Sequence, residues 1–302
     1  MKRVRKHISA LLVAVFLLTG TVLQSFAITI ANGQKVYNGI LYGCVKGSNT
    51  SQYYTDNANF YTYTRANGAR TSLRMMYVAS NSAGTPILDN NGNKIYAYCI
   101  EFGVEARNSK DMQANDVKDT DFWRNLSQTQ QLGITYAQMY GFPANSLGVA
   151  NCDAYTATQI LIWEYQLGYR TLDGTLHNAH FYYDVIVGTP AESAYWELAN
   201  MIATHKTVPS FSNSSSAPTY DMNYNASTGR YELWLHDYNN VLKYFSVTTN
   251  NSNVGVYQSG NDLLLYSYTP VSNVRISLNK NTIKNSTLID SVFLCSSMMS
   301  KD

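Results

Sequence analysis

The segment that most restricts how this 302-residue chain can fold is residues 152–168, which is apolar on almost every side of a helix. Ala154, Ala157 and Leu161 form one stripe at helical spacing. Trp163 adds an apolar side chain on another side of the same helix. Because a helix that is apolar all round has to be enclosed by other elements, this segment predicts a buried helix inside a sizeable core.

Two more helices are predicted near this segment. Ser127, followed three residues later by Gln130, resembles a capping box, and apolar residues at helical spacing continue up to Gly141. A further helix is predicted over residues 191–205. We therefore expect a helical subdomain at about residues 119–206.

Short runs rich in Tyr, Val, Ile and Thr lie on both sides of the helices and alternate with turns of Gly, Asn and Ser. These runs predict strands over residues 37–45, 58–65, 73–79, 95–102, 220–224, 231–235, 242–248, 254–258 and 263–268. The order of strands, helices and strands predicts an α+β fold, in which β portions like a sandwich or barrel flank the inserted helices.

The first 27 residues have the pattern of a secretory signal peptide. Four basic residues lie between Lys2 and Lys6, residues 8–18 are apolar, and small residues lead to a cleavage site after Ala27. The apolar stretch is short for a helix that spans a membrane, which favours cleavage over a retained anchor. We therefore expect a secreted or cell-surface protein with no membrane span after the signal peptide is removed.

The charge of the mature chain argues against a nucleic-acid partner. Removal of the signal peptide takes away four of the 22 Lys and Arg residues and none of the 20 Asp and Glu residues, which leaves a formal charge near −2. No basic patch is evident. The 25 tyrosines supply rigid amphipathic surface, so one hypothesis is a reversible module whose Tyr-rich loops hold a glycan or a protein without a covalent step.

Four cysteines follow the signal peptide, which is too low a density for a disulfide scaffold. Two bridges, or one bridge and two thiols, are both compatible with this count. The pairing and redox state of Cys44, Cys152 and Cys295 therefore stay open.

Cys99 belongs to the predicted strand over residues 95–102. Period-two alternation places it on one face with Ala97 and Glu101. A cysteine beside a carboxylate, in a chain poor in cysteine, points to covalent chemistry as well as to the simpler role of a small buried side chain.

Three motifs resemble, in order and spacing, the signatures of thioester domains in Gram-positive surface adhesins. The motifs are Tyr98-Cys99-Ile100-Glu101, Thr158-Gln159-Ile160-Leu161-Ile162-Trp163 and Tyr257-Gln258-Ser259. The resemblance covers about residues 37–269. Leu161 replaces the usual Ala of the second motif, and Gly260 and Asn261 follow the third motif where hydrophobic residues are usual.

The resemblance implies an internal thioester between Cys99 and Gln258. The Cys99 thiolate would attack the side-chain carboxamide of Gln258 and expel ammonia, which needs neither a cofactor nor a metal. Gln159 is the alternative acyl donor. Its place inside the buried helix favours a structural amide that hydrogen-bonds the loop carrying the thioester.

The remaining motif residues have supporting positions. Tyr98, Trp163 and Tyr257 are expected to wall the thioester from water. Thr158 and Glu101 lie beside the second glutamine and the cysteine, respectively. The implied partner is a host surface or matrix protein, whose lysine amine would open the thioester and remain attached as an amide. Such a domain would react once and would not be an enzyme.

The resemblance also implies domain boundaries. Residues 1–27 would be the signal peptide, residues 28–270 the thioester domain, and residues 271–302 a linker or the truncated start of a following β module. No sorting signal is evident, so the mode of attachment to a cell wall stays open.

A Cys–His transglutaminase or protease is a further alternative, in which Cys99 is a recycled nucleophile beside a histidine. The available histidines are His177, His180, His205 and His236. No protease signature surrounds Cys99. His177 and His180 also have the spacing of a metal pair, but no third ligand is close in the sequence, so no metal is expected.

Overall fold

The computed structural model describes residues 12–16, 30, 33–39, 42–52, 59–89, 91–103, 111–114, 120–212, 218–280 and 291–294. The chain divides into two compact units. The first unit comprises residues 1–23 and 204–282, and the second comprises residues 24–203 and 283–302. Together they contain both sheets and helices, which confirms the predicted α+β class.

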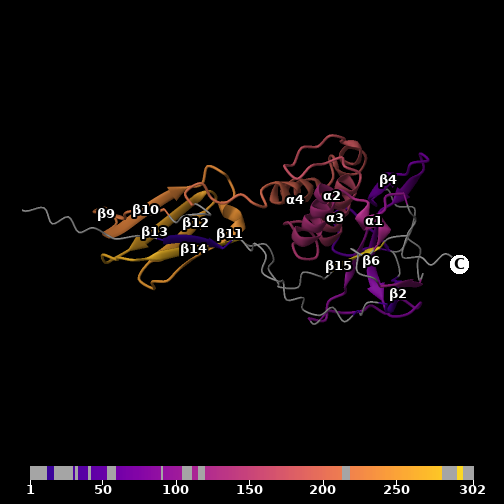
Figure 1. Cartoon of the computed structure of the whole chain (residues 1–302), viewed down its shortest axis with the longest axis horizontal. Coiled ribbons are helices and arrows are strands. Elements are labelled where there is room, and N and C mark those ends of the chain that lie inside the picture. Colours follow the sequence, from indigo (N-terminus) through magenta and orange to yellow (C-terminus); the bar gives the residue numbers. More distant parts are fainter. Residues whose placement is uncertain are drawn as a thin grey trace, which may run out of the picture. The chain divides into compact units, whose positions relative to one another are not determined.

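The second unit contains a mixed sheet with the strand order β15-β7-β6-β2-β8 (Figure 1). Its strands are β2 (Lys35–Asn38), β6 (Arg74–Ala79), β7 (Tyr96–Cys99), β8 (Asp111–Gln113) and β15 (Ser291–Leu294). Beside them, β3 (Tyr42–Gly43) pairs with β6, and β4 (Thr62–Thr64) forms a hairpin with β5 (Arg70–Ser72). The predicted run over 37–45 is therefore divided between β2 and β3.

The strand predicted over 95–102 ends at Cys99, which corrects its expected length. Its alternation holds up to that point. Ala97 belongs to a buried cluster with Val78 and Ile95, and Cys99 packs against the same cluster. Tyr98 points the other way and stacks on a helix residue, Tyr155, at 4.7 Å between ring centroids.

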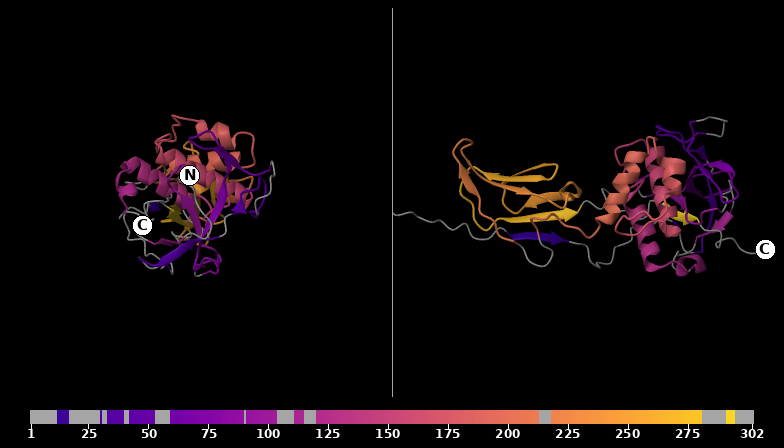
Figure 2. Two further views of the ribbon diagram at one scale, coloured as in Figure 1. Left: turned by 90° about the vertical axis from the view of Figure 1, so that its right-hand side faces the viewer. Right: turned by 90° about the horizontal axis from the view of Figure 1, so that it is seen from above.

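The helices of the second unit lie where the sequence predicts them. They are α1 (Asp121–Arg124), α2 (Gln128–Tyr140), α3 (Asn151–Gln166), the single π-helical turn η2 (Tyr182–Ile186) and α4 (Glu192–Ala203). Ser127 caps α2, and the reciprocal bonds of the predicted capping box with Gln130 are both present. Figure 2 shows these helices gathered on one side of the β elements of the unit.

Helix α3 is buried along its length, as its apolar pattern predicts. Every residue from 152 to 165 is buried, including Asp153 and Glu164. The Asp153 carboxylate accepts hydrogen bonds from the backbone N–H of Gly47 at 2.9 Å and the hydroxyl of Tyr61 at 2.8 Å. These bonds tie the first turn of α3 to the chain that follows β3.

The buried carboxylate of Glu164 forms an ion pair with the guanidinium of Arg170. The guanidinium Nε lies 2.7 Å from Glu164 Oε2, and the two side chains are 0 % and 1 % exposed. Tyr195 of α4 donates its hydroxyl to Glu164 Oε1 at 2.7 Å. Burial raises the pKa of Glu164, while Arg170 and Tyr195 act in the opposite direction.

The first unit is a two-layer β structure. One sheet has the order β12-β13-β10-β9 and the other has the order β1-β14-β11. The strands are β1 (Leu12–Phe16), β9 (Asn223–Asn225), β10 (Arg230–His236), β11 (Phe245–Thr249), β12 (Gly255–Ser259), β13 (Asp262–Ser267) and β14 (Arg275–Lys280). A 3-10 turn, η3 (Leu242–Tyr244), precedes β11. Buried residues such as Leu263, Ile276 and Leu278 fill the interior.

Two parts of this unit bear on the predicted boundaries. Strand β14, expected to begin a following module, instead pairs antiparallel with β11 and completes its sheet. Strand β1 lies within the predicted signal peptide. It pairs in parallel with β14 on the edge opposite β11, so β14 lies between β1 and β11. The boundaries 1–27, 28–270 and 271–302 stay predictions.

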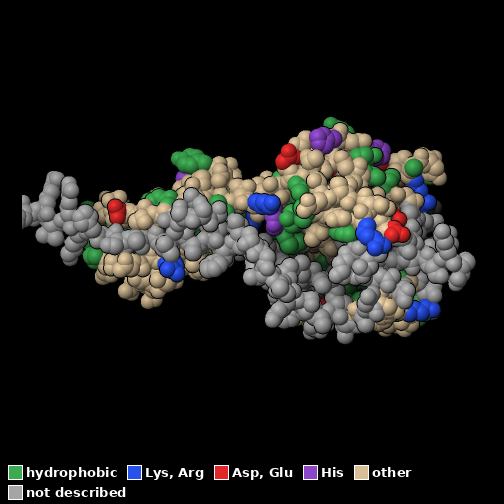
Figure 3. Space-filling view, in the orientation of Figure 1, with side chains coloured by type: hydrophobic (Ala, Val, Ile, Leu, Met, Phe, Trp, Pro, Cys, Tyr) green, Lys and Arg blue, Asp and Glu red, His purple; other side chains and the backbone are tan. Residues whose placement is uncertain are grey.

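The visible face of the molecule bears scattered charges among uncharged polar groups (Figure 3). Among the described residues, no helix has both the length and the apolar character needed to cross a bilayer.

Candidate functional site

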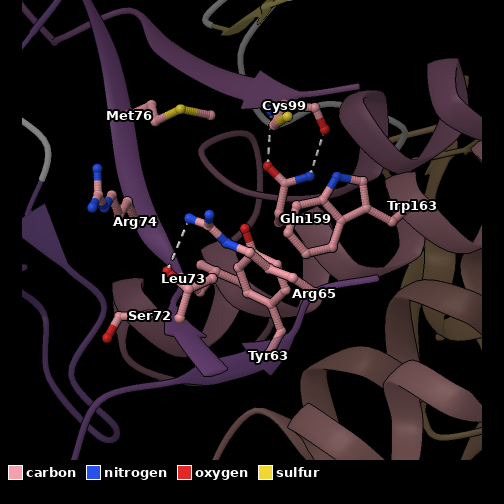
Figure 4. Close-up of a pocket in the computed structure, with 10 residues that line it drawn as sticks. Tyr63, Arg65, Ser72, Leu73, Arg74, Met76, Cys99, Gln159 and Trp163 are labelled. Atoms are coloured by element: carbon pink, nitrogen blue, oxygen red, sulfur yellow. Dashed lines mark hydrogen bonds between the residues drawn. The ribbon is translucent and has the colours of Figure 1, made fainter. Parts of the chain in front are cut away.

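Cys99 lies at the end of β7, where the chain leaves the sheet. Its backbone is held there by the side chain of Gln159 from α3. The Cys99 N–H donates to Gln159 Oε1 at 2.9 Å, and Gln159 Nε2 donates to the Cys99 carbonyl at 2.8 Å (Figure 4). Gln159 is 2 % exposed, so this pair of bonds fixes the position of the cysteine from inside the core.

Gln159 thus joins helix α3 to the end of β7. A second glutamine on the last turn of α3 acts in a similar way, because Gln166 Oε1 accepts a hydrogen bond from the N–H of Phe102 at 3.1 Å. Helix α3 therefore holds the chain on both sides of Glu101.

The Cys99 pocket is the hollow beside this cysteine. It is lined by Tyr63, Arg65, Thr71, Ser72, Leu73, Arg74, Met76, Cys99, Gln159 and Trp163. Figure 4 shows Arg74 of β6 on the side of the pocket opposite Trp163, and Tyr63 of β4 next to the Trp163 ring. Two cationic side chains, two aromatic rings and a thiol thus share one hollow.

Trp163 lines this pocket together with Cys99. The ring is 3 % exposed and packs between other aromatic rings. Its centroid lies 4.9 Å from that of Tyr63, 5.2 Å from that of Phe102 and 5.7 Å from that of Phe181. These contacts hold the indole in one orientation.

Tyr98 and Thr158 lie behind the cysteine instead of around the pocket. Tyr98 is fully buried, and its hydroxyl donates to the carbonyl of Phe142. Thr158 Oγ1 accepts from the N–H of Phe142 at 3.0 Å and donates to the carbonyl of Ala154 at 2.8 Å. Both residues thus fix the loop after α2 against β7 and α3, and Tyr98 is not among the residues that line the pocket.

The Cys99 thiol meets its neighbour Glu101 through the main chain. Cys99 Sγ donates to the Glu101 carbonyl at 3.1 Å, because the chain bends immediately after β7. The alternation that predicts a shared face for the thiol and the carboxylate therefore stops at Cys99. Burial raises the pKa of Tyr63 across the pocket, and the neighbouring Cys99 adds to this effect.

Gln258 and Tyr257 belong to β12 of the first unit. Gln258 Nε2 donates to the carbonyl of Leu242 at 2.8 Å and to that of Phe245 at 3.3 Å. Tyr257 is 56 % exposed. Since Cys99 lies in the other unit, its pairing with Gln258 stays a prediction.

The histidines do not gather into a metal site within the described part of the chain, where no group of three His, Cys, Asp or Glu side chains is suitably placed. His177 and His180 are exposed in the loop after α3. His236 pairs with Asp262 in the first unit, with 2.6 Å between Nδ1 and Oδ1. None of the described residues that line the Cys99 pocket is a histidine.

Sequence reasoning missed the side of the pocket that β4, β5 and β6 supply. Tyr63 and Arg74 lie in short strands, and Arg65 lies in the turn after β4; none of them belongs to a motif. They approach Cys99 only because the hairpin and β6 fold beside α3. The sequence contains no local signal that would have identified them.

Comparisons with known proteins agree with the motifs. No curated protein matches the chain. Among solved structures, the thioester domain of the Staphylococcus aureus TIE protein is similar, with 17 % sequence identity, coverage of 78 % of each chain and a TM-score of 0.39. A family model described as the thioester domain matches residues 96–204, which hold Cys99, Gln159 and Trp163. This match confirms the resemblance predicted from the motifs, and residues 96–204 are similar to the thioester domain family.

Proposed function

We propose that this protein is an extracellular adhesin whose Cys99 and Gln258 form an internal thioester that captures a lysine amine on a host surface. The observation that carries the proposal is the placement of Cys99. Its backbone is clamped by a buried glutamine at the rim of a pocket walled by Trp163, inside the segment that matches the thioester domain family.

The bond would form without outside energy. The Cys99 thiolate attacks Cδ of Gln258, the bond from Cδ to Nε2 breaks, and the thiol proton leaves on ammonia. The bonds from Gln159 fix the backbone of Cys99, which limits the positions open to its sulfur and helps to hold it in near-attack geometry. The reactive state is thus a property of the folded chain.

The stored acyl group would then react once with an amine. A primary amine attacks the thioester carbonyl carbon, a C–N bond forms, the C–S bond breaks, and a proton from the amine passes to the Cys99 thiolate. Leu73 and Met76 in the pocket lining are 2 % and 3 % exposed and contribute apolar surface, which helps to limit hydrolysis of a thioester there. A lysine side chain is long and unbranched enough to enter such a pocket.

Labelling with methylamine tests this proposal. We expect methylamine to add once to the purified chain, at Gln258, and not to add to the Cys99→Ala variant. Addition at Gln159 would identify the alternative acyl donor. Addition that persists in Cys99→Ala, or no addition to the wild-type chain, would contradict the thioester.

Capture of a host protein is tested separately. Wild-type protein incubated with host surface or matrix protein should keep it bound through a denaturing wash, and Cys99→Ala should release it. The reversible Tyr-rich module would be favoured by a different result. In that case the wild type and Cys99→Ala would retain the host protein equally after a mild wash, and neither would retain it after a denaturing wash.

A further inference from the structure

The indole N–H of Trp163 is a buried donor without a partner. Nε1 has almost no exposed surface and makes no hydrogen bond within the described part of the structure. Buried donors in folded proteins are paired with few exceptions, and an exception often marks a functional position. This donor lines the same pocket as the thiol of Cys99.

The helix explains why the donor lies there. Trp163 follows Gln159 by one turn of α3, so both side chains project from one face toward the end of β7. Figure 4 shows the indole nitrogen on the edge of the ring beside Gln159 and Cys99. The packing of the ring against Tyr63, Phe102 and Phe181 prevents it from turning toward another acceptor.

We propose that Trp163 Nε1–H donates a hydrogen bond to the acyl oxygen of the Cys99 thioester and to the oxyanion that forms when an amine attacks it. This assignment rests on the proposed thioester function. The acyl oxygen is the acceptor that the buried donor lacks before the thioester is present. Trp163 is then a catalytic residue of the single reaction as well as a wall of its pocket.

In this assignment, the indole N–H donates to the oxygen atom on which negative charge develops during the reaction. As the amine nitrogen bonds to the carbonyl carbon, the carbonyl oxygen becomes an oxyanion, and the indole N–H lies ready to stabilise it. The C–S bond then breaks, the carbonyl reforms, and a proton from the amine is transferred to the Cys99 thiolate. A fixed donor in a water-poor pocket does not have to reorganise, and loss of one such donor lowers rates by about 10²- to 10³-fold in enzymes that use them.

Trp163→Phe tests the assignment, because it keeps the aromatic ring and removes the N–H. We expect the second-order rate constant for methylamine to fall by about 10- to 1,000-fold. Trp196→Phe is the matched control, since this tryptophan of α4 is 43 % exposed and does not line the pocket. Its rate should equal that of the wild type. A wild-type rate in Trp163→Phe would overturn the assignment.

A second measurement does not depend on the folding of Trp163→Phe. The chain has four tryptophans, so variants Trp123→Phe, Trp196→Phe and Trp234→Phe assign the remaining indole N–H resonance of the ¹⁵N-labelled wild type to Trp163. This resonance should shift when methylamine opens the thioester, and an unchanged resonance would overturn the assignment. A wild-type chain whose mass is not reduced by one ammonia would contradict the proposed thioester itself. A chain that has lost ammonia but shows an unchanged Trp163 resonance would contradict only the role of Trp163.

A different observation concerns Cys44 and Cys152. Both are completely buried free thiols. Burial and the neighbouring Cys152 raise the pKa of Cys44, while Cys44 lowers the pKa of Cys152. Backbone bonds hold the two segments together, with the Cys152 N–H donating to the Ser48 carbonyl at 3.0 Å and the Gly47 N–H donating to Asp153 at 2.9 Å. The two cysteines therefore lie in neighbouring buried segments of the second unit.

We infer that Cys44 and Cys152 form a disulfide when the chain is exported. The two thiols lose two electrons and two protons to a disulfide-bearing oxidant, which is reduced to its dithiol. The bridge would close a long loop between β3 and α3 and so stabilise the helix that clamps Cys99.

Peptide mapping without reduction tests this inference on the wild-type chain. After treatment with oxidised glutathione and alkylation in denaturant, we expect one linked pair of peptides that holds Cys44 and Cys152, lighter by two hydrogens than the separate peptides. Recovery of both as alkylated thiols, or linkage of either to Cys99, would overturn it. Repetition in the Cys99→Ala chain removes exchange with that thiol as a source of the result.

Discussion

At the scale of single residues, the polar groups that lie inside α3 explain most of the site. A glutamine within an apolar helix must find partners, and Gln159 finds them on both sides of the Cys99 peptide unit. The need of the Gln159 amide for hydrogen-bond partners could be predicted from the sequence, because the apolar periodicity indicated that the helix is buried. The unpaired indole of Trp163 could not be predicted, since pairing depends on the atoms around it.

Removal of the Gln159 side chain tests the clamp. Gln159→Ala leaves the N–H and the carbonyl of Cys99 without these partners, so we expect the free energy of unfolding to fall by about 2 kcal/mol or more and thioester formation to slow. The measurement is urea denaturation together with the rate of ammonia loss. Gln166→Ala, which removes one bond to Phe102 from the same helix, is the control and should cost about 1 kcal/mol without slowing the reaction. Equal effects of the two variants on the reaction would contradict the clamp.

At the scale of elements, the helices and the strands β4, β6 and β7 were predictable, but the lengths of the strands and the pocket that they form together were not. The capping box at Ser127 and the apolar pattern after residue 152 are local, and both mark helices in the structure. The strand of Cys99 was expected to continue to residue 102. It ends at Cys99, whose N–H and carbonyl are both bonded to the side chain of Gln159, a residue 60 positions away.

The cap of α2 gives a prediction at this scale. Ser127→Ala removes the side chain that accepts from the N–H of Gln130, so we expect a loss of about 1 kcal/mol in the free energy of unfolding. Ser127→Asp should restore most of it, because Asp also caps helices well. A Ser127→Ala chain as stable as the wild type in urea would contradict the role of the box.

The buried pair of Glu164 and Arg170 gives a larger effect. Glu164→Ala leaves the Arg170 charge buried without its carboxylate, so we expect a loss of about 3–5 kcal/mol. Substitution of both residues, as Glu164→Leu with Arg170→Met, should recover much of the loss, because a packed apolar pair often replaces a buried ion pair without cost. A double variant no more stable than Glu164→Ala, measured by chemical denaturation, would show that the ion pair is not the cause.

At the scale of the whole molecule, the order of strands, helices and strands led to the right class of fold. The two β portions differ, however, in ways that composition does not encode. One is a two-layer structure of seven strands in the described chain, and the other is a mixed sheet that carries the helices and Cys99. Pairings between distant strands decide this difference, and they depend on tertiary contacts instead of local sequence.

The pH dependence of the free energy of unfolding tests the environment of His205 in the first unit. Burial, aided by Lys280 and Lys206, lowers the pKa of His205 to about 4 from an ordinary 6.5. Between these two pH values the unfolded chain binds more protons at this residue than the folded chain. The folded chain is therefore most stable above pH 6.5, where His205 is neutral in both states, and it loses stability as the pH falls toward 4. Thermal unfolding from pH 7 to pH 4 should show this loss, and His205→Asn should reduce it. An equal loss in the variant would assign it to other groups.

The measurement that tests the central claim most directly is the intact mass of the purified chain, compared with the mass calculated for the same residues. Allowing for the two hydrogens of a Cys44–Cys152 disulfide, the wild type should be lighter than its sequence by one ammonia, and methylamine should add to it once. Cys99→Ala and Gln258→Ala should each have the mass of their own sequence and should not react. A wild-type chain at its full sequence mass, to which methylamine adds nothing, would contradict the claim that Cys99 and Gln258 share a thioester.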